Sequence, residues 1–184
     1  VLRLTMLFHD MGKPVMKTTD ENGRDHFKGH AIASEQIAKT VMKRLKFDND
    51  TIRKVTKLVA YHDYRMEPTG ANVRRAMHEI GVELFPYYLA VRLADTKAQS
   101  SYERRGKLEN IIQIRELYRN ALRNKECVTL KDLAVTGTDL INLGIAPGKE
   151  LGTLLNELLD MVIEDPAWNQ KGKLCDYVKE RFGF

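Results

Sequence analysis

Histidines and aspartates stand at the ends of apolar stripes in four separate segments of the sequence. Within each segment the apolar residues recur every three or four positions, the spacing of residues on one face of an α-helix. The stripes are Leu2 and Met6 leading to His9 and Asp10; His30 leading to Ala33, Ile37 and Val41; Ile52, Val55 and Val59 leading to His62; and Leu84, Tyr88 and Val91 leading to Asp95. We therefore expect four helices to point ligand-type side chains into the interior.

The combination of imidazoles with carboxylates indicates a metal site. A single buried histidine is usually a hydrogen-bonded core residue, but two buried carboxylates cost several kcal/mol unless cations or hydrogen bonds compensate them. Mixed nitrogen and oxygen donors suit a divalent ion, with Mg, Mn, Ni, Zn, Fe and Co as candidates. An incomplete protein shell leaves positions for water, which is typical of catalytic sites. The predicted metal ligands are His9, Asp10, His30, His62 and Asp95.

The segment HDMGKP adds a cation beside this predicted site. Gly12 can end the first helix, and Lys13 then places an ammonium group next to the metal, where a phosphate would bind. The alternative is that Lys13 is a solvated cation favoured by the helix dipole.

Helical periodicity recurs along most of the chain, while the alternation of a strand is scarce, so the sequence predicts an all-α fold. The segment 18–25 is polar and predicts an exposed loop or short hairpin. A change of character near residues 124–128 predicts a domain boundary there. The expected helices cover residues 1–11, 30–46, 49–63, 71–79, 82–99, 102–124, 148–164 and 171–182.

Composition places the chain among ordinary globular proteins, with 43% apolar residues in 184. It has no long apolar run and no signal-peptide pattern, which favours a soluble, cytoplasmic protein without membrane contact. The distant cysteines, Cys127 and Cys175, are predicted to be buried, reduced thiols rather than a disulfide framework. A net charge of +5 favours phosphate-bearing partners, or is simply a solvated surface. The chain opens on Val1 already in helical phase, so we expect it to be a piece of a longer protein.

The motifs LFHDMGKP, HFKGH, VAYHD and RLAD, in this order, resemble the HD superfamily of metal-dependent phosphohydrolases. More narrowly, the run from His9 to Asp63 is similar to the HD domain of bacterial tRNA nucleotidyltransferases, the CCA-adding enzymes. The segment TGTDLINLGIAPGKELGTLLNELLDMVIEDPAWN resembles the C-terminal end of the same family. The resemblance covers nearly the whole chain.

The resemblance implies an HD-type helical bundle over residues 1–125 and a small helical, RNA-binding appendage over 126–184. It implies metal ligation by His9, Asp10 and Asp95, with His30 and His62 as further ligands or phosphate-facing groups; Asp63 and His26 are weaker candidates. It also implies an upstream histidine ligand and an N-terminal nucleotidyltransferase head. The Gly-Ser and Asp-x-Asp arrangement of that head does not occur here, so nucleotide addition is not expected of this chain.

A second set of residues predicts contact with RNA. In LGIAPGKELG, a turn at Gly148 opens a helix whose amide groups and Lys149 could hold phosphates, and Arg104 and Arg105 add charge elsewhere. Arg74, Arg75, Lys107, Arg115, Arg119 and Arg123 could extend this basic face. The alternatives are a helix cap and ordinary solvated helix faces. Trp168 could stack on a base, or could pack the last helices together.

Three functions remain open from the sequence. The first is a metal-dependent phosphohydrolase acting on 2′,3′-cyclic or 2′-phosphates of nucleotides or RNA, with Lys13, His30 and His62 as catalytic residues and tRNA as partner. The second is a non-catalytic segment that binds and positions tRNA. The third is a free-standing HD hydrolase acting on nucleotides.

Overall fold

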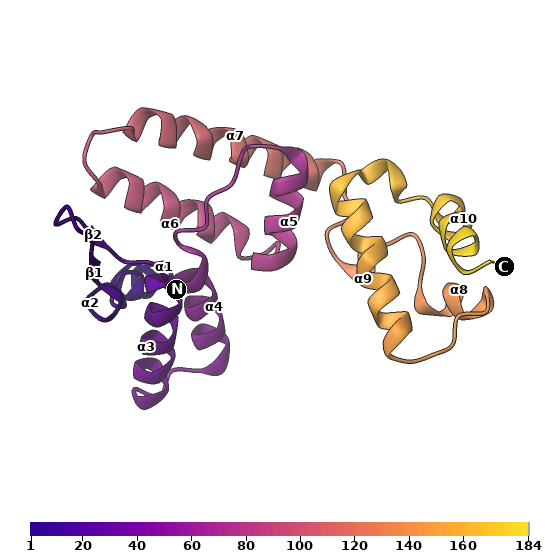
Figure 1. Cartoon of the computed structure of the whole chain (residues 1–184), viewed down its shortest axis with the longest axis horizontal. Helices are drawn as coiled ribbons and strands as arrows, with labels where there is room; N and C mark the ends of the chain where they lie inside the picture. Colours follow the sequence, from indigo (N-terminus) through magenta and orange to yellow (C-terminus); the bar gives the residue numbers. More distant parts are fainter. Residues whose placement is uncertain (184) are drawn as a thin grey trace. The chain divides into compact units, whose positions relative to one another are not determined.

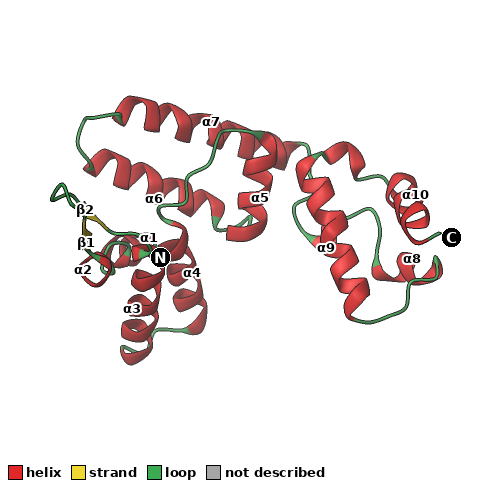
Figure 2. Cartoon of the chain, viewed as in Figure 1, coloured by secondary structure: helices red, strands yellow, loops and turns green. Residues whose placement is uncertain are grey.

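The computed structural model describes residues 1–183 and is mostly helical (Figures 1 and 2), which confirms the predicted all-α class. The helices are α1 (Leu2–Phe8), α2 (Lys13–Met16), α3 (His30–Arg44), α4 (Asn49–Tyr61), α5 (Gly70–Ile80), α6 (Phe85–Ala98), α7 (Arg104–Arg123), α8 (Gly137–Asn142), α9 (Lys149–Glu164) and α10 (Lys171–Phe182). Short 3₁₀ turns occur at Leu130–Asp132 and Pro166–Trp168.

The chain divides into two compact units. Unit 1 comprises Val1–Met66 and Ile80–Gln113, and unit 2 comprises Glu67–Glu79 and the segment from Ile114 onward. The boundary expected near residue 125 remains a prediction. Among residues 1–183, no helix is both long and apolar enough to cross a bilayer.

Unit 1 is built around the packing of α3 against α4, with α1 lying against α4 and α6. Its core includes Phe8 from α1, Ala38 and Met42 from α3, and Val55 and Val59 from α4, all nearly or fully inaccessible to solvent. Burial of these apolar side chains removes hydrocarbon from water and is the main force that holds the three helices together.

The predicted stripes are correct in two helices and displaced in two. On α4 and α6 the buried residues follow the expected positions. On α3 the buried residues are Ser34, Ala38 and Met42, one position later than predicted, and on α1 they are Thr5 and Phe8 rather than Leu2 and Met6. The polar Ser34 is buried because its hydroxyl accepts a hydrogen bond from the Gly12 amide at 2.8 Å, a partner that the sequence pattern does not reveal.

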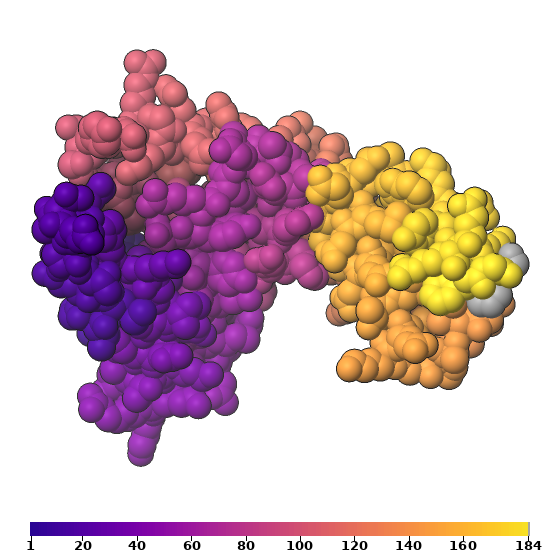
Figure 3. All heavy atoms as spheres, viewed as in Figure 1, coloured from indigo at the N-terminus to yellow at the C-terminus, as the bar shows by residue number. Residues whose placement is uncertain are grey.

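The polar segment after α2 forms a short hairpin, which was one of the two structures predicted for it. Strands β1 (Thr18–Thr19) and β2 (Asp25–His26) pair antiparallel, with Thr18 opposite His26. The carboxylate of Asp20 accepts hydrogen bonds from the amides of Asn22 and Arg24 and closes the turn. Figure 3 shows this N-terminal part of the chain on the surface of unit 1.

Unit 2 has its own core, formed mainly by α9 and α10 with α8 and the preceding loop. Leu158, Val162, Leu174 and Val178 are fully buried in it. Trp168 packs against this core with its ring 6.2 Å from that of Tyr177, which supports the packing alternative for this residue. The sequence did not predict α8, where Thr136 and Asp139 form a capping box around a helix of only six residues.

Both cysteines are free thiols, as predicted, but only Cys127 is buried, whereas Cys175 is partly exposed. Burial raises the pKa of the Cys127 thiol from 9.0 to about 11, and the nearby Asp132 carboxylate acts in the same direction. Cys127 is therefore a protonated core residue at neutral pH rather than a nucleophile.

Arg74 contradicts its expected role on a basic RNA-binding face, because it is only 7% exposed. Its guanidinium donates hydrogen bonds to the carbonyl groups of Ile163 at 2.7 Å and Glu164 at 3.0 Å, at the end of α9. It also forms an ion pair with the Glu126 carboxylate at 2.8 Å. The residue is therefore a cap for α9, supplying donors to carbonyl groups that have no partner within the helix.

Replacing Arg74 with methionine is expected to lower the free energy of unfolding of unit 2 by roughly 3 kcal/mol, because it leaves Glu126 half-buried without its cation and uncaps α9. Urea denaturation followed by circular dichroism measures this change. The matched control is Arg75→Met, since Arg75 is exposed and pairs with the exposed Glu164; a loss within about 0.5 kcal/mol is expected. Equal losses in the two variants would contradict the capping role.

Candidate metal centre

Four elements of unit 1 bring the predicted ligands into one region. His9 caps the C-terminus of α1 and Asp10 follows it, while His30 is the first residue of α3. His62 caps the C-terminus of α4, and Asp95 lies on α6. Gly29 precedes His30 with φ of +83°, a left-handed conformation that favours glycine and turns the chain into α3.

The three histidines are fixed by the same local contact. In each ring Nδ1 lies within hydrogen-bond distance of the carbonyl oxygen three residues earlier: Met6 for His9 at 2.7 Å, Phe27 for His30 at 2.9 Å and Val59 for His62 at 2.7 Å. A carbonyl only accepts, so each Nδ1 carries the proton and donates it. Each Nε2 is then free to act as a metal ligand, with the ring orientation already fixed.

Asp10, His30 and His62 form a group that could hold a metal ion. The Nε2 atoms of His30 and His62 are 3.1 Å apart, and Asp10 Oδ1 lies 3.4 Å from the first and 3.6 Å from the second. Two donors bound to one ion at about 2.1 Å are separated by about 3.0–3.4 Å, so the observed spacing fits shared coordination. Two Nε2 lone pairs at this distance would repel each other unless a proton or a cation lay between them. The donor set therefore fits a divalent cation.

The two carboxylate oxygens of Asp10 face different neighbours. Oδ1 points toward His30 and His62, whereas Oδ2 accepts a hydrogen bond from Lys13 Nζ at 2.6 Å and lies 3.3 Å from His9 Nε2. Lys13 is the residue predicted to face a phosphate, and it is close enough to the centre to do so. The sequence predicted that Gly12 could end the first helix, but α1 ends at Phe8, and Gly12 is instead the N-cap residue that precedes α2.

Asp95 lies near the same Nε2 atom of His9 that Asp10 approaches. Its Oδ1 is 3.8 Å from His9 Nε2, and its Oδ2 accepts a hydrogen bond from the Gln99 side chain at 2.7 Å. The interaction with Asp95 raises the pKa of His9 above its ordinary value of 6.5, although burial acts in the opposite direction. The same interaction lowers the pKa of Asp95. Asp95 is thus ionised at neutral pH.

His62 is the most buried of the five residues, with a side chain 3% exposed. Burial lowers its pKa below 6.5, and the positive charges that His9 and His30 can carry act in the same direction. The neutral imidazole, which is the form that binds metal, is therefore favoured at neutral pH.

The centre opens into a cavity of about 490 Å³. Asp10, Lys13, His30, His62 and Asp95 all line it, while His9 does not. The weaker candidates Asp63 and His26 are also on its wall: Asp63 forms an ion pair with Arg65 at 3.0 Å, and His26 Nε2 lies 2.9 Å from Asp20. Sequence reasoning missed Gln99 and Arg24, which also line the cavity, because neither belongs to a motif.

The comparisons with known proteins identify a family whose matched region includes several of these residues. The family described as tRNA nucleotidyltransferase domain 2 matches residues 30–178, which is most of the chain. This chain belongs to that family. His30, His62 and Asp95 lie within the matched residues, while His9 and Asp10 precede them.

This tRNA nucleotidyltransferase domain 2 is also similar to a curated protein. It is 30% identical over 168 residues to the CC-adding tRNA nucleotidyltransferase of Thermus thermophilus, and the match covers 88% of this chain and 36% of that protein. The chain thus spans about a third of the length of that relative. No solved structure matches it significantly.

The predicted RNA-binding residues of the domain are divided between the two units. Arg104 donates a hydrogen bond to the carbonyl group of Gln99, and Arg105 is 93% exposed and pairs with Glu109, both in unit 1. Gly148 and Lys149 belong to unit 2, where Lys149 begins α9. Their contact with RNA remains a prediction.

Proposed function

We propose that this chain is an HD-type, metal-dependent phosphohydrolase module within a tRNA nucleotidyltransferase. The observation that carries the proposal is the convergence of His30 Nε2, His62 Nε2 and Asp10 Oδ1, with each histidine oriented by a hydrogen bond from Nδ1 to a backbone carbonyl. Ligands oriented in this way by neighbouring groups are typical of functional metal sites. We assign His9 and Asp95 as additional ligands, because Asp10 Oδ2 and Asp95 Oδ1 lie 3.3 Å and 3.8 Å from His9 Nε2.

A divalent ion, when bound, lowers the pKa of a coordinated water and offsets charge on a phosphoryl group. The residues of this chain supply the remaining requirements. Asp10, His30 and His62 hold the ion, and the Lys13 ammonium stands at the cavity wall, where it can bind a non-bridging phosphate oxygen. Because His62 is neutral at neutral pH and its Nε2 is a ligand, we assign it to metal binding rather than to protonation of the leaving oxygen.

We further propose a 2′,3′-cyclic phosphate or 2′-phosphate on RNA as the substrate class. Membership in the tRNA nucleotidyltransferase domain 2 family and the similarity to a CC-adding tRNA nucleotidyltransferase support tRNA as the partner, in the cytoplasm. The curated relative is longer than this chain, which supports an N-terminal nucleotidyltransferase head in the full-length protein. Gly148, Lys149, Arg104 and Arg105 are the residues we assign to RNA contact.

Metal removal tests the proposal. The purified chain is expected to hydrolyse bis-p-nitrophenyl phosphate with a divalent ion bound. EDTA should reduce turnover at least 100-fold, and adding back Mn²⁺, Ni²⁺, Zn²⁺, Fe²⁺, Co²⁺ or Mg²⁺ should restore it. Elemental analysis should find about one metal equivalent per chain before EDTA treatment. A chain that binds tRNA but neither retains metal nor turns over substrate would instead support the non-catalytic positioning role. Hydrolysis of free nucleoside triphosphates in preference to RNA ends would favour a free-standing nucleotide hydrolase.

A further inference from the structure

A polar groove leads away from the candidate metal centre along α6 and α7. The cavity at the centre is followed by a narrow neck of about 30 Å³ and an outer cavity of about 470 Å³. The central cavity and the neck share Asp63, Arg65, Asp95 and Gln99 as lining residues. The neck and the outer cavity share Arg65, Arg92 and Lys107. Each hollow therefore shares lining residues with the next one, and all three hollows lie within unit 1.

Two helix faces form the walls of this groove. On α6 and the residue after it the lining residues are Arg92, Asp95, Thr96 and Gln99, and on α7 and the residue before it they are Glu103, Gly106, Lys107 and Asn110. Both sets follow the spacing of three, four and seven residues that defines one side of a helix. Each face spans about 10 Å at 1.5 Å per residue, which is longer than a single phosphate requires. Figure 1 shows α6 and the start of α7 running side by side beyond their connecting loop.

The cations of the groove have neutral partners at the neck. Arg92 donates a hydrogen bond to the carbonyl group of Tyr64, and Lys107 donates one to the side-chain carbonyl of Gln99 at 3.1 Å. Among residues 1–183, neither has a carboxylate within 4.0 Å, whereas Arg65 pairs with Asp63. Arg92 and Lys107 thus hold two positive charges without a compensating acid at hydrogen-bond distance. Glu103, in the wall of the outer cavity, adds one negative charge there.

We infer that this groove binds the RNA strand that leads to the terminal phosphate at the metal centre, with Arg92 and Lys107 contacting phosphates of the preceding nucleotides. The inference rests on the proposed phosphohydrolase function and specifies its substrate as an oligoribonucleotide end rather than a mononucleotide. A mononucleotide has a phosphate only for the central cavity. The positive charges at the neck can be contacted only by an oligonucleotide that carries further phosphates. Met66, half-buried in the outer cavity, offers an apolar surface to a base.

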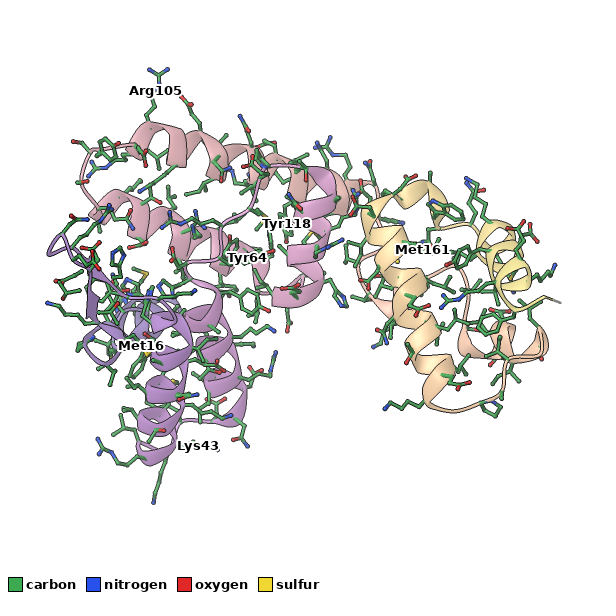
Figure 4. The ribbon with its side chains drawn as sticks, in the orientation of Figure 1. Met16, Lys43, Tyr64, Arg105, Tyr118 and Met161 are labelled. Atoms are coloured by element: carbon green, nitrogen blue, oxygen red, sulfur yellow. The ribbon has the colours of Figure 1, made fainter. Side chains whose placement is uncertain are left out.

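The test compares adenosine 2′,3′-cyclic phosphate with a trinucleotide that ends in the same group, using the metal-loaded full chain. We expect kcat/KM for the trinucleotide to be at least 10-fold higher, and Lys107→Gln to lower this preference about fivefold, mainly through KM. The matched control is Lys43→Gln: Lys43 is exposed in the last turn of α3 (Figure 4) and lines none of the three hollows, so the preference should not change. A preference below twofold, or the same decrease in both variants, would overturn the inference.

Filling the groove gives an independent measurement. A Cβ added at Gly106 meets nothing within 4 Å, so larger side chains can be accommodated in the fold while occupying the groove. We expect kcat/KM for the trinucleotide to decrease more for Gly106→Leu than for Gly106→Ala, and the mononucleotide to be less affected. Circular dichroism checks that both variants fold. An equal decrease for both substrates would place the effect at the metal centre and contradict the inference.

A failure of the proposed function is distinguishable from a failure of the groove. If neither substrate is hydrolysed, the phosphohydrolase proposal fails, and binding of a fluorescein-labelled trinucleotide is measured by anisotropy. Weaker binding by Lys107→Gln than by Lys43→Gln would still support the groove as an RNA site. Equal binding by the two variants would overturn it.

Discussion

Replacing Asp10 with asparagine is expected to lower divalent metal affinity more than about 100-fold and bis-p-nitrophenyl phosphate turnover on the order of 10³-fold. Asp10 supplies the carboxylate oxygen that lies within 3.6 Å of both His30 Nε2 and His62 Nε2. Asparagine has nearly the same shape, so the change removes one negative charge from the metal site with little effect on packing. It also removes the ionic partner of Lys13. Isothermal titration with Mn²⁺ and steady-state kinetics measure the two effects.

The matched control is Asp160→Asn, an exposed position on α9 in unit 2. Both variants lose one negative charge, so a general electrostatic effect would appear in both. We expect metal affinity and turnover of Asp160→Asn to remain within twofold of the unmodified chain. Retention of metal and turnover by Asp10→Asn would falsify the assignment of the centre.

Gly12→Ala is expected to destabilise unit 1 by about 3 kcal/mol or more, because the added methyl group has no space. Its Cβ would lie 2.6 Å from the amide nitrogen of Ser34 and closer still to the carbonyl oxygen of His30. These are backbone atoms at the start of α3 that cannot move without shifting the helix. The φ of Gly12 is −80°, so the requirement for glycine is the close approach rather than the backbone conformation. Urea denaturation measures the loss of stability.

The same substitution should also lower metal affinity, because moving α3 away from Gly12 separates His30 from Asp10. Gly152→Ala is the control, since its Cβ meets nothing within 4 Å and alanine favours a helix; a gain of roughly 0.5–1 kcal/mol is expected. A second variant, Ser34→Ala, removes only the hydrogen bond to the Gly12 amide and should cost about 1–2 kcal/mol. If Gly12→Ala were as stable as Gly152→Ala, the close approach would play no part in positioning the site.

Local sequence patterns predicted the elements that present the ligands. The apolar stripe on α4 identified Ile52, Val55 and Val59 as core residues and placed His62 at the end of the same face. The pattern worked because this face is buried along its length against apolar partners, so periodicity and burial coincide. The helices at 30–44 and 104–123 were likewise predicted to within two residues at each end.

Features that depend on a distant partner were not predictable. The shift of the buried face on α3 arises from the contact between Gly12 and Ser34, which are 22 residues apart in sequence. Arg74 looked like one of several exposed cations, but α9 ends beside it and supplies the carbonyl acceptors that make its burial possible. The short helix α8 has a good capping box, yet its six residues carry too little periodicity to be detected.

The sequence by itself determined the all-α class, the positions of the longer helices and the residue types able to bind a metal, since these follow from periodicity and side-chain chemistry along a single segment. Only the tertiary structure decided which ligands meet. It brings Asp10, His30 and His62 within 4.8 Å of one another and places Asp95 beside His9. It also revealed the groove between α6 and α7. Distances between segments depend on how helices pack, and packing is set by complementary shapes and partners that no single stretch of sequence contains.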